Sequence, residues 1–305
     1  MWLVYAFVAA ILLGFYDVFK KVSLRDNAVI PVLFLNTLFC TLIFLPFIVV
    51  SWACPSLQDS IFYVPVVGWE VHRYLILKAF IVLSSWICGY IGIKNLPLTI
   101  VGPINATRPV MILLGAMLVF GERLNLYQWI GVTLAIVSFY MLSRSGKKEG
   151  IDFKHNKWIF FTVMASVMGA VSGLYDKYLL AMEGQGGIGL NRMVVQSWNN
   201  IYQLILMGIV LLVLWWPKRK VGTPFRWHWS ILLISVFLSA ADFMYFYALS
   251  LDGAMISIIS MIRRGSVLVS FFFGAMFFKE KNLKSKAVDL ALVFLGLLFL
   301  YLGSR

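Results

Sequence analysis

The stretch PLTIVGPINATRPVMILLGAMLVFGE at residues 97–122 has a looser counterpart, GAMISIISMIRRGSVLVSFFFGAMFFKE, at residues 253–280. Each carries an arginine deep in an apolar run, Arg108 or Arg264, and then Gly-Ala-Met before a glutamate. Farther out, GFYDVF at 14–19 recurs as GLYDKY at 173–178. Because these matches keep their order and lie about half the chain length apart, they predict an internal duplication.

The apolar runs also decide the class of protein. Of the 305 residues, 61% are hydrophobic and 13% are charged, whereas a soluble domain has about 45–50% apolar and about 25% charged residues. The excess is too large for a soluble core and indicates surface that faces lipid. The runs approach the roughly 20 residues that a membrane-spanning helix needs, and they lack the alternation of barrel strands. We therefore predict an all-α polytopic membrane protein.

Turn residues divide the chain into ten predicted transmembrane helices. Their approximate ranges are 2–20, 30–51, 74–95, 97–120, 126–144, 157–181, 190–216, 229–250, 253–278 and 286–303. We expect a first five-helix repeat at 1–146, a basic linker at 147–156 and a second five-helix repeat at 157–305. An odd number of helices per repeat makes the second enter from the opposite side, so the two repeats are expected to be inverted, as is common in transporters.

The positive charges predict the orientation. The net charge is +13, but it lies in short loops between apolar runs, which argues against nucleic acid as a partner. One set of alternate loops holds Lys20, Lys21, Arg25, Lys94, Arg144, Lys147, Lys148, Lys154, Lys157, Lys218, Arg219, Lys220, Arg226, Lys279, Lys281, Lys284 and Lys286. The other set holds only Arg73, Arg123, Arg192 and Arg305. The positive-inside rule puts the first set in the cytoplasm and both termini outside, in a membrane that we expect to be the bacterial inner membrane.

Part of the sequence resembles a known family. Residues 96–146 resemble an EamA domain of the drug/metabolite transporter superfamily, through Arg108-Pro109, FGE at 120–122 and YQWIG at 127–131. The second half repeats the pattern more loosely, as FKE at 278–280. The resemblance implies a secondary transporter for small metabolites with its site between the two halves. Two departures are Gly265, where the family usually has proline, and Lys279, where it usually has glycine.

Two arginines are predicted near the middle of the membrane. Arg108 and Arg264 each lie about 11 residues into their helix, or roughly 16 Å, which is half the hydrocarbon thickness. Charge at this depth tends to be functional, and the arginine fork fits carboxylate or phosphate. Asn105 and Ser260 share a helix face with Arg108 and Arg264 respectively. The Arg263-Arg264 pair resembles the Lys-Arg pair of the sugar-phosphate translocators, which implies contact with a substrate phosphate and Arg108 as partner.

The membrane aspartates offer an alternative. Asp17, Asp176 and Asp242 could instead pair internally with these arginines, and substrate could displace such a carboxylate. Lys20 and Lys21 follow Asp17 at helix-end spacing. Asp17 and Asp176, in the repeated Gly-x-Tyr-Asp, could also form a gate on each side with Tyr16 and Tyr175. Asp242 is a candidate for proton coupling or for contact with a substrate amine.

Other polar and aromatic residues are candidates for the cavity wall. Gln196, Asn199, Asn200 and Gln203 share one helix face, which suits a cavity better than isolated interhelical contacts. Trp198 is expected to line the cavity, and Tyr245 and Tyr247 to contact the substrate side chain.

The sequence lacks the groups that other function classes require. It has no histidine cluster, paired-carboxylate metal site or nucleophile with a base, so we predict no enzyme, no catalytic residue, no metal and no cofactor. A channel is disfavoured because inverted repeats favour alternating access. We predict a secondary active transporter of a phosphorylated or carboxylated metabolite, acting in the lipid bilayer with a proton or counter-substrate, as a monomer or homodimer. The alternatives are an amino-acid or aromatic-metabolite exporter and a proton-coupled drug efflux protein.

Overall fold

The computed structural model describes residues 2–54, 58–112, 125–147, 155–180, 187–220, 223–249, 259, 262–277 and 283–303. The regular elements in these ranges are helices, without a strand. The elements are α1 (Trp2–Leu24), α2 (Val29–Ala53), α3 (Trp69–Asn95), α4 (Leu98–Ala106), α6 (Leu126–Lys147), α7 (Lys157–Leu180), α8 (Arg192–Val210), a π turn (Leu211–Trp215), a 3₁₀ turn (Trp216–Lys218), α9 (Ser230–Leu249), α11 (Ser266–Phe277) and α12 (Leu283–Gly303). Every predicted span overlaps one of these helices.

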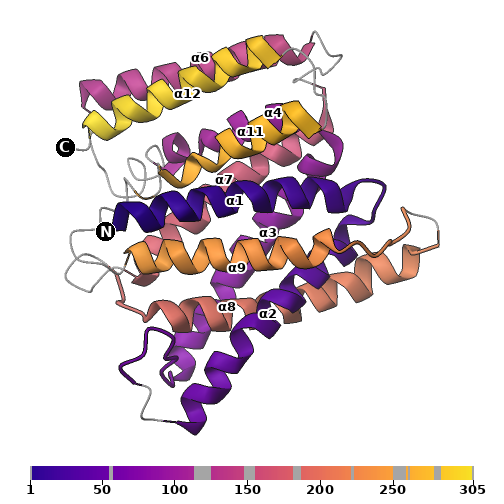
Figure 1. The fold of residues 1–305 in the computed structure, drawn as a ribbon, viewed down its shortest axis with the longest axis vertical. Helices are drawn as coiled ribbons and strands as arrows, with labels where there is room; N and C mark the ends of the chain where they lie inside the picture. Colours follow the sequence, from indigo (N-terminus) through magenta and orange to yellow (C-terminus); the bar gives the residue numbers. More distant parts are fainter. Residues whose placement is uncertain are drawn as a thin grey trace.

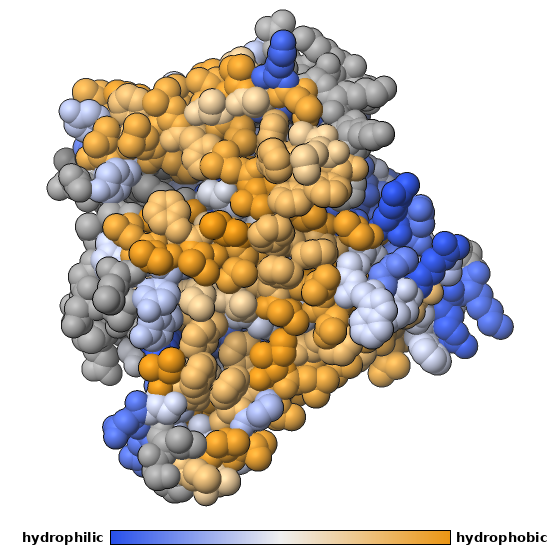
Figure 2. All heavy atoms as spheres, viewed as in Figure 1, coloured by the Kyte–Doolittle hydropathy of each residue, from blue (hydrophilic) through white to orange (hydrophobic). Residues whose placement is uncertain are grey.

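The all-helical membrane class is confirmed. Seven helices in the described ranges are long and apolar enough to cross a membrane, and the prediction of ten crossings in two repeats stays a prediction. The helices run side by side (Figure 1). The face drawn in Figure 2 is mostly apolar, and hydrophilic residues gather toward its edges, where helices end. Such a surface needs lipid as its solvent.

The two helices that carry the central arginines are both interrupted. We expected one continuous helix at 97–120, but α4 ends at Ala106, Thr107 forms a turn, and helical structure resumes at 108–112. Pro109 explains the break, because it has no N–H to donate to the carbonyl of Asn105. The expected helix 253–278 is likewise interrupted at Gly265, whose N–H bonds to the carbonyl of Ile262 at 2.8 Å. In membranes such breaks occur where neighbouring groups satisfy the freed backbone.

The helices of the two halves interlock. α1 packs mainly on α9, α3 on α7, α2 on α8, and α6 on α12, so each of these pairs joins one helix from residues 1–147 to one from residues 157–303. α4 packs mainly on α11, which brings the two interrupted helices together (Figure 1). The centre of the molecule is therefore built from both halves.

A lysine of α1 caps the end of α3. The ammonium of Lys21 donates to the carbonyls of Ile93 and Leu96, both at 2.6 Å, where the last carbonyls of a helix lack partners. Lys21, which follows Asp17 by four residues, thus holds the C-terminal end of α3.

Replacing Lys21 by methionine should therefore lower the free energy of unfolding by about 2 kcal/mol, the usual value of hydrogen bonds to a charged donor. The measurement is SDS-titrated unfolding in mixed micelles. Arg25→Met is the matched control, because Arg25 is exposed in the loop that follows α1 and should change stability by less than about 0.5 kcal/mol. Equal losses in the two variants would contradict the capping role.

Candidate substrate site

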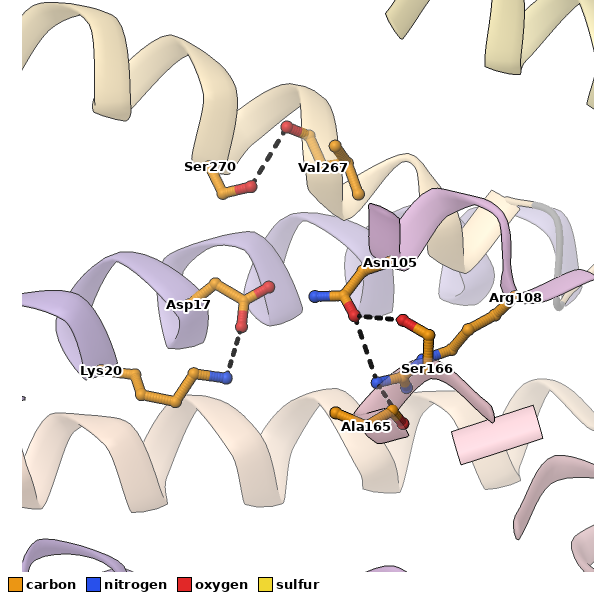
Figure 3. Close-up of polar contacts among 8 residues, drawn as sticks. All are labelled: Asp17, Lys20, Asn105, Arg108, Ala165, Ser166, Val267 and Ser270. Atoms are coloured by element: carbon orange, nitrogen blue, oxygen red, sulfur yellow. Dashed lines mark hydrogen bonds and ion pairs between the residues drawn. The ribbon is translucent and has the colours of Figure 1, made fainter. Parts of the chain in front are cut away.

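The side chain of Arg108 packs against α7. Its Nη2 donates to the Asn105 side-chain oxygen and to the carbonyl of Ala165, each at 3.4 Å. The hydroxyl of Ser166 donates to the same Asn105 oxygen at 3.0 Å (Figure 3). The guanidinium lies against Gly169, where a Cβ atom would fall 2.5 Å from Cζ of Arg108. A backbone carbonyl, two small residues and an amide therefore hold this arginine in place.

Arg264 lies just before the break at Gly265 and is close enough to Arg108 and Arg263 to interact with both electrostatically. Its Nε atom is buried without a hydrogen-bond partner among the described residues. The Nε atoms of Arg108 and Arg263 are also unpartnered. The three guanidinium groups are thus close enough to interact where α4 and α7 approach the segment before α11, and Asp17 also interacts electrostatically with Arg108 and Arg264. Three cations facing one such carboxylate leave a positive charge that favours a bound anion.

Asp17, Asp176 and Asp242, the three aspartates considered above as internal partners, are each paired with another cation. Asp17 bonds to Lys20 at 2.7 Å, Asp176 pairs with Lys78, and Asp242 pairs with Arg263. In the described ranges no carboxylate lies within ion-pair distance of Arg108 or Arg264. Internal pairing therefore applies to Arg263 but not to the two arginines expected at the midplane.

The expected gate residues lie at two different places. Tyr16 is buried, and Lys20 lies 4.1 Å from its ring centroid and 5.2 Å from that of Tyr90. Tyr175 lies in α7 and donates its hydroxyl to the carbonyl of Tyr74 at 3.2 Å. The aspartate of each Gly-x-Tyr-Asp thus pairs with a lysine, and the tyrosine of each has a contact of its own.

The remaining predicted site residues form other contacts. The Cζ atom of Arg263 lies 4.1 Å from the ring centroid of Tyr245, so Tyr245 belongs to the arginine cluster. Tyr247 packs edge-on against Tyr5. Trp198 packs against His72, with ring centroids 4.6 Å apart.

Two of the predicted amides lie elsewhere. Gln196 and Asn199 are buried in α8, and Gln196 donates to the carbonyl of Ser239 in α9 at 3.5 Å. None of the hydrogen bonds seen in the described ranges joins either amide to the arginine cluster. Ser260 lies outside the described residues.

The sequence did not predict the contacts of several buried residues in and around the site. No sequence pattern indicated that Lys78 of α3 pairs with Asp176 of α7. Ser166 and Gly169 had no signal, because small residues in an apolar helix are common. The charge pattern also placed Lys286 in a basic cytoplasmic loop, but Lys286 is fully buried in α12 and donates to the hydroxyl of Thr99 at 2.8 Å. That assignment was wrong, because α12 begins at Leu283.

Comparison with known proteins gives three findings. A profile of the EamA-like transporter family matches residues 1–144. Over 301 residues the chain is 23% identical to an uncharacterized transporter of Archaeoglobus fulgidus, and the match covers 96% of this chain and 95% of that relative. One crystal structure superposes with a TM-score of 0.59 at 14% sequence identity, covering 99% of this chain and 97% of the other. At this identity the structural match concerns the fold alone.

Proposed function

We propose that this chain, whose residues 1–144 match the EamA-like transporter family, is a membrane transporter that moves a small organic anion by alternating access. The proposed substrate carries a phosphate or carboxylate group. One observation carries the proposal: Arg108 and Arg264 have no carboxylate partner in the described ranges, while Asp17, Asp176 and Asp242 are all paired with other cations.

The electrostatics support an anion over the other substrate classes. A buried charge is stable only with a compensating partner, and for Arg108 and Arg264 a substrate anion supplies it. Bidentate hydrogen bonds to an arginine fork suit both phosphate and carboxylate. An amino acid or an organic cation would need a carboxylate for its amine, and Asp242, the candidate for that role, is occupied by Arg263.

The packing supports two inverted five-helix repeats. If the halves are repeats, α1, α2 and α3 correspond to α7, α8 and α9. The contact of α1 with α9 then corresponds to that of α7 with α3, and the contact of α2 with α9 to that of α8 with α3; all four are present. The pairs α2–α8, α4–α11 and α6–α12 exchange into themselves. Inverted repeats of this kind rock around a site near the midplane, which suits the position of Arg108 and Arg264.

The ion pairs support a gate toward each side. Asp17 with Lys20 and Tyr16 would close the cytoplasmic side, and Asp176 with Lys78 and Tyr175 the outer side. In this orientation, which follows the positive-inside rule, both termini are outside and the loops rich in lysine and arginine lie in the cytoplasm.

The anion proposal is tested by thermal unfolding of the detergent-purified protein with matched panels of phosphate esters, carboxylates, amino acids and organic cations. An anion at about 100 times its dissociation constant should stabilise the folded state by about 2.7 kcal/mol. Arg264→Gln should lose this stabilisation, because it removes one of the two guanidinium groups that lack a carboxylate.

Arg73→Gln is the matched control, since Arg73 is an exposed arginine of α3 whose side chain is 58% accessible. It should keep the full anion response. Stabilisation by cations alone, or an anion response that persists in Arg264→Gln, would refute the proposed site.

A further inference from the structure

A seam of buried polar residues runs between α2, α8 and α9, which lie together in Figure 1. Its members are Asn36, Thr37, Cys40 and Thr41 from α2, Gln196, Asn199, Asn200 and Gln203 from α8, and Ser235 and Ser239 from α9, each at most 8% exposed. Hydrogen bonds cross it between each pair of these helices: Ser235 donates to the Asn36 side chain at 3.0 Å, Thr41 to the carbonyl of Asn200 at 3.0 Å, and Gln196 to the carbonyl of Ser239 at 3.5 Å. The seam thus joins three helices.

Many polar atoms of the seam have no protein partner. In the described ranges, the unpartnered atoms are Nδ2 of Asn36, Oδ1 of Asn199, both side-chain polar atoms of Gln203 and Oγ of Ser239. A buried polar atom without a hydrogen bond costs about 1–3 kcal/mol, so several together require another partner. They include donors, acceptors and a hydroxyl that is both. Water satisfies such a mixed set and typically makes about three hydrogen bonds in a buried site.

The seam leads to Asp242. Ser239 precedes Asp242 by three residues in α9, so both lie on one helix face. Asp242 also interacts electrostatically with Cys40 of the seam. Its other titratable or charged neighbours are Arg263 before α11, Tyr245 in α9, Lys78 in α3, Asp176 in α7 and Tyr16 in α1. Of these, Arg263 forms the ion pair.

We propose that the seam holds a file of water molecules that exchanges protons with Asp242, so that the substrate anion crosses together with a proton. This inference rests on the proposed anion transport and adds its coupling. A hydronium ion in the seam gives its proton to a carboxylate oxygen of Asp242 and remains as water. The neutral carboxyl then releases Arg263, whose guanidinium can join Arg108 and Arg264 in binding the anion. When the anion leaves, Arg263 returns to Asp242 and the proton goes back to water.

Thermodynamic linkage makes the coupling reciprocal. If protonation of Asp242 strengthens anion binding, anion binding must promote proton uptake by the same factor. The adjacency of Arg263 and Arg264 in one helical turn accounts for this link, because Arg263 serves either the carboxylate or the anion.

The water in the seam is tested first, by X-ray radiolysis of the full-length protein in detergent. Hydroxyl radicals formed from bound water oxidise the side chains next to it. Cys40 is 2% exposed inside the seam, and Met193 is 1% exposed in an apolar cluster of α8. We expect Cys40 to be oxidised at least about tenfold faster than Met193, and Gln203→Leu to remove most of this difference.

Ser85→Ala is the matched control, because Ser85 is equally buried but donates to the carbonyl of Ala165 between α3 and α7, outside the seam. It should leave oxidation of Cys40 unchanged. Oxidation of Cys40 no faster than that of Met193, or no slower in Gln203→Leu, would overturn the water file.

The proton is tested with inorganic sulfate, an anion whose own charge is constant between about pH 5 and 8. Sulfate binding to the wild-type protein in weak buffer should take up about one proton per protein, recorded with a pH indicator. In Asp242→Asn, sulfate should bind without proton uptake and with an affinity independent of pH. Sulfate binding without proton uptake in the wild type would overturn the coupling and leave the anion site standing. A failure of sulfate, phosphate esters and carboxylates alike to bind would overturn both.

Discussion

Replacing Lys78 by methionine should lower the free energy of unfolding by about 3–5 kcal/mol, because it leaves the carboxylate of Asp176 buried without its partner. The Lys78 side chain is 4% exposed and that of Asp176 is 17% exposed, so water compensates little of the lost attraction. The loss should appear in SDS-titrated unfolding in mixed micelles. The double variant Lys78→Met/Asp176→Leu should recover most of it, since replacing both charges by apolar groups is often neutral or stabilising.

The exposed pair of Arg73 with Glu70 is the matched control, because both of its side chains are more than half accessible. Arg73→Met should cost at most about 1 kcal/mol. If Lys78→Met cost no more than Arg73→Met, or if the double variant were no more stable than the single one, Asp176 would have another source of compensation and the pair would not hold α3 to α7.

Replacing Gly169 by alanine should weaken anion binding by about 30-fold or more. The added Cβ would lie 2.5 Å from Cζ of Arg108, so the guanidinium has to move away from α7 although no charge is removed. Loss of a buried charge contact typically costs 2–5 kcal/mol, and each 1.4 kcal/mol corresponds to a factor of ten. The measurement is the concentration of stabilising anion that gives half of the thermal shift.

Gly173→Ala provides the matched control one turn farther along α7. Its added Cβ would lie 3.3 Å from Cδ1 of Ile112, the flexible end of an aliphatic side chain. Both substitutions favour the helix to a similar degree, so any stability gain should be shared. Equal anion affinity in the two variants would show that Arg108 does not bind the anion from its position against α7.

The sequence predicted the features that depend on local pattern. Long apolar runs determine where helices form in a membrane, and the expected ranges overlap the described helices, apart from the breaks after Ala106 and at Gly265. Pro109 after Arg108 is also a residue that breaks helices, and it accounts for the interruption of the helix expected at 97–120. The family resemblance drawn from residues 96–146 agrees with the profile match at residues 1–144.

The pairing of charges could not be predicted, because it depends on which helices are neighbours. Asp176 and Lys78 are 98 positions apart, and only the packing of α7 on α3 brings them together. Lys286 illustrates the opposite difficulty. It follows Lys281 and Lys284 and so resembles a loop residue, but the first turn of α12 carries it into the protein interior beside Thr99.

The interlocked packing of the two halves has a consequence for biosynthesis. When residues 1–146 have left the ribosome, α1, α2, α3 and α6 have entered the membrane before the helices on which they mainly pack have been made. Until then Lys78 lacks its partner Asp176, and Arg108 lacks the carbonyl of Ala165 in α7. Assembly therefore follows insertion. A nascent chain halted at its midpoint would lack the α7 groups that pair with Lys78 and Arg108 in the complete fold.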